Sequence, residues 1–123
     1  MPPRESNSWL ASARVHVAAV ENPTLDFRLR CFHGQRAVEM SLKAVLIHHG
    51  VSYPFTHELD SLMELVPGGV PDHVIEASRL TPHAVQEMYP DTFTDLGADH
   101  ADEAVELARA VIEWATAIIE PTP

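Results

Sequence analysis

The chain has little cysteine and little lysine, with one residue of each among its 123. Cys31 cannot form a disulfide within the chain, and its apolar neighbourhood predicts a buried structural thiol rather than a reactive one. The sequence also lacks the roughly 20 consecutive apolar residues that a membrane-spanning helix needs, and its first residues contain no apolar signal-peptide core. We therefore expect a cytoplasmic protein that makes no contact with a membrane.

Positive charge is scarce as well. Only 8 Lys and Arg residues stand against 18 Asp and Glu residues, which gives a net charge of −10. Because binding along a nucleic-acid backbone depends on clustered Lys and Arg, a long nucleic-acid groove is disfavoured. Arg28, Arg30, Arg36 and Lys43 nevertheless fall in one stretch. A local basic patch is therefore compatible with the sequence, although solvated helix positions are the simpler explanation for Arg28 and Arg30.

Common metal and cofactor motifs are also missing. The sequence has 8 histidines but neither the Glu-x-x-His spacing of di-iron helical bundles nor the His-Glu-x-x-His motif of zinc enzymes. His48 and His49 are adjacent, so they point to different faces of a helix. A glycine-rich phosphate loop is absent too. We expect neither a bound metal nor a cofactor.

Residues 31–46 are the centre of the sequence pattern and predict the middle of a long helix over residues 26–49. At about 100° per residue, apolar side chains collect on two opposite sides of this helix, so other segments must cover both sides. A polar stripe of Gln35, Glu39 and Lys43 runs between them. The order of Glu39 and Lys43, four residues apart, favours an ion pair within the helix.

Two residues are unusual for their positions on predicted helices. Gly34 costs about 1 kcal/mol relative to alanine inside a helix, which indicates close approach of another helix, either in this chain or in a second subunit. His16 lies on the apolar face of the first predicted helix. A histidine in such a place is more often a hydrogen-bonded core residue than a ligand.

Helical periodicity and helix breakers divide the rest of the chain into segments. A disordered arm at residues 1–5 is followed by a first helix capped by Ser6 or Ser8 and by the central helix. A short third helix is capped by Thr56, and a fourth begins near Pro71 and is interrupted or restarted by Pro82. The last helix is capped by Asp99 and runs to residue 119. No segment alternates as a strand does. The sequence thus predicts a single all-α domain over residues 1–123, an antiparallel up-and-down bundle of four to five helices.

The central stretch resembles the HEPN domain, a small all-helical domain. The family's motif is an aromatic residue, a Gln, a Glu four residues later and a Lys-Ala four residues after that, which Phe32, Gln35, Glu39 and Lys43-Ala44 match. Residues 56–62 resemble the family's short third helix, and residues 80–91 its Leu-Thr to Tyr-Pro-Asp segment. These segments follow one another in the family's order and span most of the chain.

The resemblance implies a homodimer and a noncatalytic nucleotide-binding or partner-binding component of a nucleotidyltransferase or toxin–antitoxin type system. Its implied partners are a nucleotidyltransferase-type protein and a nucleotide or RNA ligand. The candidate nucleotide-binding residues are Glu39, Lys43, His57, Tyr89 and Asp91. A simple intrahelical pair is the alternative for Glu39 and Lys43, helix capping is the alternative for His57, and a structural corner is the alternative for Tyr89 and Asp91.

Ribonucleases of this family carry an Arg followed after four to six residues by a His, in the helix after the short third one. Met88 stands where relatives often have Arg, and Arg79 and His83 are one residue too close. Arg28 and His33 have the bare spacing but lie on the central helix, so they are weak catalytic candidates for phosphate binding and proton transfer. A ribonuclease toxin with this displaced site is one alternative function, and a purely structural dimerisation domain is another.

Overall fold

The computed structural model describes residues 3–85 and 96–121. Its elements in chain order are α1 (Pro3–Val20), α2 (Phe27–His48), α3 (Leu59–Met63), α4 (Asp72–Ile75), the 3₁₀ helix η1 (Glu76–Val85) and α5 (Ala98–Ile119). Within these ranges no residue belongs to a strand. The predicted helical fold is confirmed.

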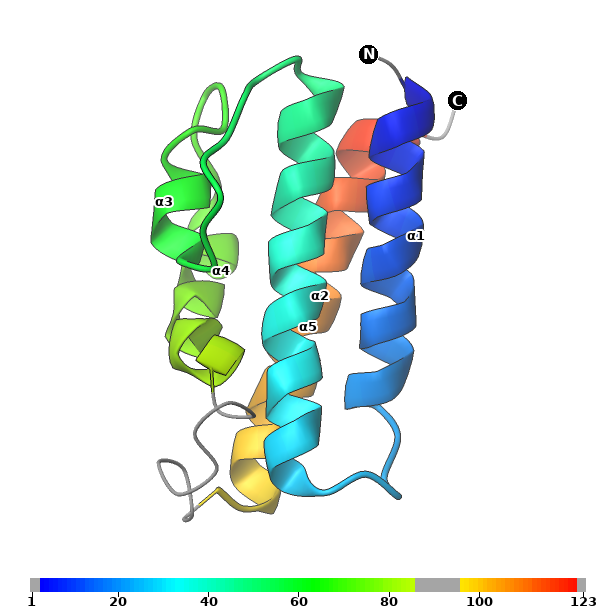
Figure 1. Cartoon of the computed structure of the whole chain (residues 1–123), viewed down its shortest axis with the longest axis vertical. Coiled ribbons are helices and arrows are strands. Elements are labelled where there is room, and N and C mark those ends of the chain that lie inside the picture. Colours follow the sequence, from blue (N-terminus) through cyan, green and yellow to red (C-terminus); the bar gives the residue numbers. More distant parts are fainter. Residues whose placement is uncertain (1–2, 86–95, 122–123) are drawn as a thin grey trace.

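The helices form an up-and-down bundle whose successive legs reverse direction (Figure 1). α1 runs down in that view and α2 returns beside it; the short α3 leads upward, α4 and η1 then descend, and α5 rises parallel to α2. Helix α2 packs against α1, α5, η1 and α3. The central position of α2 agrees with the two apolar faces seen in its sequence.

The ends of α2 follow its sequence signals. The Oδ1 atom of Asp26 accepts a hydrogen bond from the backbone N–H of Leu29 at 2.8 Å, which caps the helix at its N-terminus. Gly50 adopts a φ of 71° just after the last turn, a conformation that glycine reaches without steric cost. Between these ends almost every residue from Cys31 to Leu46 is buried, and the prediction of a buried Cys31 is confirmed.

Gly34 lies where α2 and α5 approach each other closely. A Cβ atom added at Gly34 would lie 2.9 Å from Ala104 Cβ and 3.4 Å from a methyl group of Val20. The close approach predicted at Gly34 is therefore made by α5 of the same chain.

Helix α1 begins earlier than predicted. Pro3 is its first residue, so Pro3 and Glu5 belong to the helix rather than to a disordered arm, and Ser6 and Ser8 lie inside it instead of capping it. Proline is tolerated in a first turn because its missing N–H has no partner there. Glu5 places a negative charge at the positive end of the helix dipole, which favours the earlier start.

The predicted N-caps at Thr56 and Asp99 are wrong. Glu58 precedes α3, and the N–H of Leu59 donates instead to Thr81 Oγ1 of η1 at 3.2 Å. α5 begins at Ala98, one residue before Asp99, and is preceded by Gly97, whose backbone N–H donates to His100 Nδ1 at 3.1 Å. The start of α3 thus involves a tertiary contact, and that of α5 a side chain within its own first turn.

The prediction that Pro82 interrupts or restarts the fourth segment is wrong. The 3₁₀ helix η1 continues through Pro82 to Val85. Ala77 and Leu80 of this helix are buried in the core beside α2. This burial holds the segment in place although proline removes one backbone donor.

We expect Gly34→Ala to destabilise the protein by roughly 1–3 kcal/mol, because the added methyl group overpacks the contact with Ala104. Urea denaturation followed by circular dichroism measures the effect. In an Ala104→Gly background the same substitution should cost less, since the opposing methyl group is gone. An equal cost in both backgrounds would show that the contact between α2 and α5 is not the cause.

Candidate polar site around Glu39

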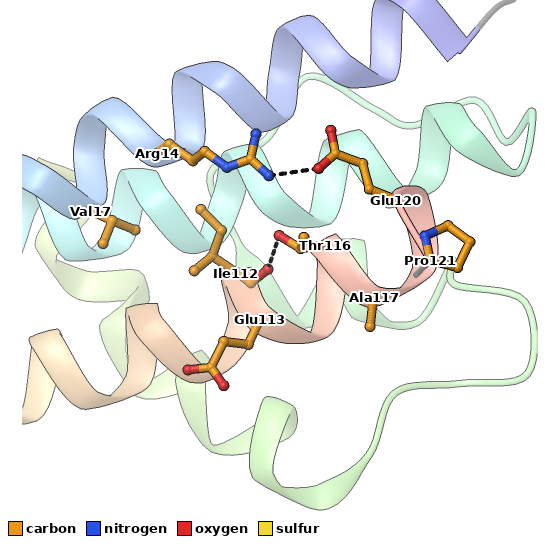
Figure 2. Close-up of a pocket in the computed structure, with 8 residues that line it drawn as sticks. All are labelled: Arg14, Val17, Ile112, Glu113, Thr116, Ala117, Glu120 and Pro121. Carbon is orange, nitrogen blue, oxygen red and sulfur yellow. Dashed lines mark hydrogen bonds and ion pairs between the residues drawn. The ribbon is translucent and has the colours of Figure 1, made fainter. Parts of the chain in front are cut away.

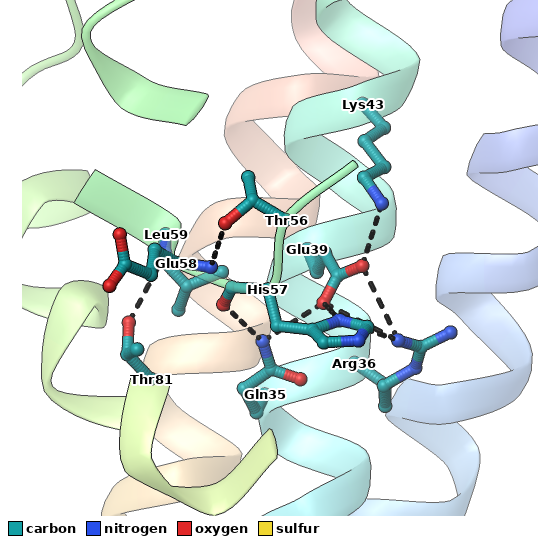
Figure 3. Close-up of polar contacts among 9 residues, drawn as sticks. All are labelled: Gln35, Arg36, Glu39, Lys43, Thr56, His57, Glu58, Leu59 and Thr81. Atoms are coloured by element: carbon teal, nitrogen blue, oxygen red, sulfur yellow. Dashed lines mark hydrogen bonds and ion pairs between the residues drawn. The ribbon is translucent and has the colours of Figure 1, made fainter. Parts of the chain in front are cut away.

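The polar stripe of α2 centres on a buried carboxylate. The side chain of Glu39 is 0% exposed, yet four neighbours approach its oxygens (Figure 3). Lys43 Nζ lies 2.8 Å from Oε2, His57 Nδ1 2.9 Å and Gln35 Nε2 3.0 Å from Oε1, and Arg36 Nη1 3.3 Å from Oε2. These contacts supply the donors that a buried carboxylate requires.

The donors decide the ionisation of Glu39. Burial alone would raise its pKa, but the hydrogen bonds from Lys43, His57 and Gln35, together with the charge of Arg36, outweigh burial and lower the pKa below the ordinary glutamate value. The carboxylate is therefore ionised at neutral pH. Lys43 and Arg36 together carry more positive charge than Glu39 neutralises.

Lys43 is enclosed by aromatic rings as well as by its ion pair. Its Nζ atom lies 5.7 Å from the ring centroid of Trp9 in α1 and 5.4 Å from that of Tyr53 in the loop after α2. The two rings meet edge to face with centroids 6.4 Å apart. An ammonium group over aromatic faces gains cation–π stabilisation. Lys43 therefore joins α1, α2 and the loop and has little exposed surface for a ligand.

His57 ties the loop of residues 51–58 to α2 at two atoms. Its Nδ1 contacts Glu39, and its backbone carbonyl accepts a hydrogen bond from Gln35 Nε2 at 3.1 Å. Because a carboxylate can only accept, Nδ1 carries the proton and donates it to Glu39. The 3.3 Å approach of Arg36 Nη1 to the same Nδ1 is then a contact without a hydrogen bond. The Nε2 atom of His57 makes no hydrogen bond to any residue in the described ranges.

Arg36 borders the cluster with most of its guanidinium unused. Its side chain is 26% exposed, and only Nη1 approaches other described side chains, at 3.3–3.4 Å from the Glu39 oxygens. The guanidinium group has five N–H donors. Nε and Nη2 of Arg36 are thus left for a ligand, beside the Nε2 of His57, whose side chain is 43% exposed.

A histidine pair lies beside this cluster. His16 of α1 and His33 of α2 stack with ring centroids 5.1 Å apart, and their Nδ1 atoms are 2.9 Å from each other. Burial, followed by the charges of His33 and Arg36, lowers the pKa of His16 to about 4. The expected hydrogen bond of His16 is present, and its ring is neutral at pH 7.

Three of the five candidate binding residues meet in one place. Lys43 and His57 both contact Glu39 directly, whereas Tyr89 and Asp91 lie outside the described residues. The intrahelical ion pair predicted for Glu39 and Lys43 is present. His57 lies before α3, and its side chain does not cap that helix.

Arg36 is the residue that sequence reasoning missed as a site residue. The sequence feature that could have identified Arg36 is its position three residues before Glu39, within the basic stretch of α2. The weak candidates Arg28 and His33 are five residues apart, which places them about 140° apart around a helix. His33 contacts His16 instead.

A separate groove lies between α1 and α5 (Figure 2). It has a volume of about 650 Å³ and is lined by apolar side chains, including Val17 and Ile112. An ion pair between Arg14 and Glu120 crosses it at 3.0 Å. No candidate residue from the sequence lines this groove.

The described residues contain no group of three or more His, Cys, Asp or Glu side chains arranged to hold a metal ion. Among the helices that the structure describes, none has both the length and the apolar character needed to cross a membrane.

Comparison with known proteins identifies the family. The fold and the buried cluster define a small helical-bundle domain, and the sequence model of the HEPN domain matches residues 4–118. The chain therefore belongs to the HEPN domain family. Its structure is similar to the crystal structure of an archaeal HEPN homologue with a TM-score of 0.61 and 21% sequence identity, covering 96% of this chain and 94% of that chain. At this identity the likeness establishes the fold alone. No match is found among curated proteins.

We expect Glu39→Gln to destabilise the protein by about 3–5 kcal/mol, because it leaves the buried ammonium group of Lys43 without its counter-ion. Urea denaturation at pH 7 measures the loss, and Glu113→Gln on the exposed side of α5 is the matched control. Since the folded pKa of Glu39 is lowered, its stabilisation is complete above the ordinary glutamate pKa. The difference from Glu39→Gln should therefore shrink as the pH falls through the folded pKa.

Combining Glu39→Gln with Lys43→Met should restore part of the lost stability, because the double variant no longer buries an unpaired charge. Equal losses for Glu39→Gln and Glu113→Gln would contradict a structural role for the buried carboxylate.

Proposed function

We propose that this HEPN domain is a noncatalytic component of a two-component system of nucleotidyltransferase or toxin–antitoxin type, and that it binds the phosphate of a nucleotide at Arg36 and His57. The proposal depends on one observation. The side chains of Arg36 and His57 are partly exposed, and both contact the buried carboxylate of Glu39. Arginine presents a planar fork of donors that suits phosphate oxygens.

The cluster has a buried part and a partly exposed part, and this difference supports ligand binding at the exposed part. Glu39 and Lys43 are buried, and their pairing is satisfied inside the protein. Glu39 contacts the side chains of Arg36 and His57 from inside the bundle. Both side chains are therefore ordered before a ligand binds. Such preorganisation lowers the entropic cost of binding. Glu39 and Lys43 are thus positioning residues rather than direct contacts to the ligand.

Charge also favours a small ligand over a long nucleic acid. The positive excess at Arg36 and Lys43 is local, whereas the whole chain carries a net charge of −10. A mononucleotide can place its phosphate on the local excess, but an extended RNA would pass over acidic surface. The proposal therefore ranks a nucleotide ligand above RNA.

The ribonuclease alternative finds less support in the described residues. Arg79 is paired with Glu103 at 3.0 Å and with Glu76 at 3.6 Å. The His33 ring is stacked on that of His16, and the Nδ1 atoms of the two rings lie 2.9 Å apart. An acid or base for RNA cleavage needs access to the ribose and phosphate.

A homodimer and a nucleotidyltransferase-type partner remain part of the proposal. The groove between α1 and α5 is open and largely apolar, which suits contact with another protein. A purely structural dimerisation domain would use such a surface and leave Arg36 and His57 without a ligand. The two functions differ in whether nucleotides bind.

Isothermal titration calorimetry with ATP, ADP and AMP tests nucleotide binding. We expect Arg36→Ala to weaken binding by roughly tenfold or more, since a hydrogen bond to a charged group contributes about 1.5–3 kcal/mol. Arg36→Lys should give an intermediate affinity because it keeps the charge but loses the fork. His57→Ala should weaken binding as well.

Arg109→Ala is the matched control, because Arg109 is an exposed arginine of α5 that pairs with Glu21 away from the cluster. Its affinity should equal that of the parent. The absence of heat with all three nucleotides would overturn the proposal and favour the structural alternative.

A further inference from the structure

Phe55 is the most exposed large apolar side chain among the described residues. It is 95% exposed, compared with 40% for Phe27 at the start of α2. A single exposed apolar residue is ordinary on a protein surface. Phe55 is unusual because of its surroundings. It lies in the loop that contains His57, one of the two proposed phosphate-binding residues.

The loop holds Phe55 close to His57 while leaving its faces open. The ring centroids of Phe55 and His57 are 6.0 Å apart and their planes meet at 65°. His57 is fixed to α2 through Glu39 and Gln35, and Tyr53 on the other side of Phe55 is fixed over Lys43. Anchors two residues away on both sides therefore determine where the Phe55 backbone lies.

We propose that Phe55 is a stacking platform for the base of a nucleotide whose phosphate lies at Arg36 and His57. This inference rests on the proposed function and deepens it by assigning the contact with the base to Phe55. Every nucleobase offers a flat face to an aromatic side chain. The neutral ring of His57 presents a lone pair at Nε2 and the protonated ring a donor, so this atom can meet either a base edge or a phosphate oxygen.

A nucleotide fits this surface better than an apolar anchor on a partner protein does. A protein hot spot is a well-packed pocket from which water is excluded, whereas Phe55 stands beside the polar His57, which in turn contacts Arg36. Stacking needs only one open ring face together with a nearby anion site. Both are present within one loop and the adjoining turn of α2.

The test compares three probes on the same protein by calorimetry. ATP carries a base and phosphates, tripolyphosphate carries phosphates without a base, and adenosine carries a base without phosphates. We expect Phe55→Ala to weaken ATP binding by roughly tenfold, within the range measured for loss of one base–aromatic stack. Its affinity for tripolyphosphate should be unchanged. Phe55→Trp should keep the ATP affinity of the parent and show quenched tryptophan fluorescence on binding.

Phe27→Ala is the control, since it removes another exposed phenylalanine outside the loop. Unchanged ATP affinity in Phe55→Ala overturns the stacking inference while the proposed phosphate site stands. Equal affinities of the parent for ATP and tripolyphosphate overturn it in the same way. If the parent binds neither compound, the proposed function fails together with the inference. If Phe55 instead contacts a partner protein, Phe55→Ala should leave the ATP affinity unchanged.

Discussion

The fold and the candidate site depend on one buried ion pair, between Glu39 and Lys43 of α2. A carboxylate without solvent contact is stable only if charged and hydrogen-bonding groups surround it. Lys43 brings the aromatic rings of α1 and of the loop after α2 around its ammonium group, and Glu39 binds that loop through His57. The same contacts thus order the α1–α2 packing, the path of the loop and the positions of the exposed donors.

This arrangement accounts for the anion site that we propose on an acidic chain. Most acidic side chains of the described residues are at the surface, while Glu39 is enclosed and compensated. Arg36 is close enough to Glu39 to be oriented by it, but its contacts of 3.3–3.4 Å are longer than the 2.8 Å contact of Lys43. A ligand held by the remaining donors of Arg36 would therefore leave the buried pair intact. In the proposed site, stability and binding are divided between two cations that share one carboxylate.

The long helices were predictable because their signals are local. Asp26, Gly50 and the apolar faces of α2 specify that helix without reference to the rest of the chain. The start of α3 was not predictable from local signals, because it involves a contact with Thr81 of η1. At the start of α5 the side chain of His100 accepts the Gly97 N–H, where the sequence indicated a cap by Asp99. In the site, the spacing of Gln35, Glu39 and Lys43 predicted the ion pair. It could not predict that a loop residue 18 positions later completes the cluster, nor that Arg36 keeps unused donors.

The most direct measurement is an NMR titration of the glutamate side-chain carboxyl carbons of the intact protein as the pH falls from neutral. If Glu39 is the compensated carboxylate that organises the structure, its carbon should titrate at a lower pH than those of the exposed glutamates in the same spectrum, and the His57 ring signals should shift with it. A midpoint for Glu39 at or above those of the exposed glutamates would show that burial outweighs its donors, and would contradict the account.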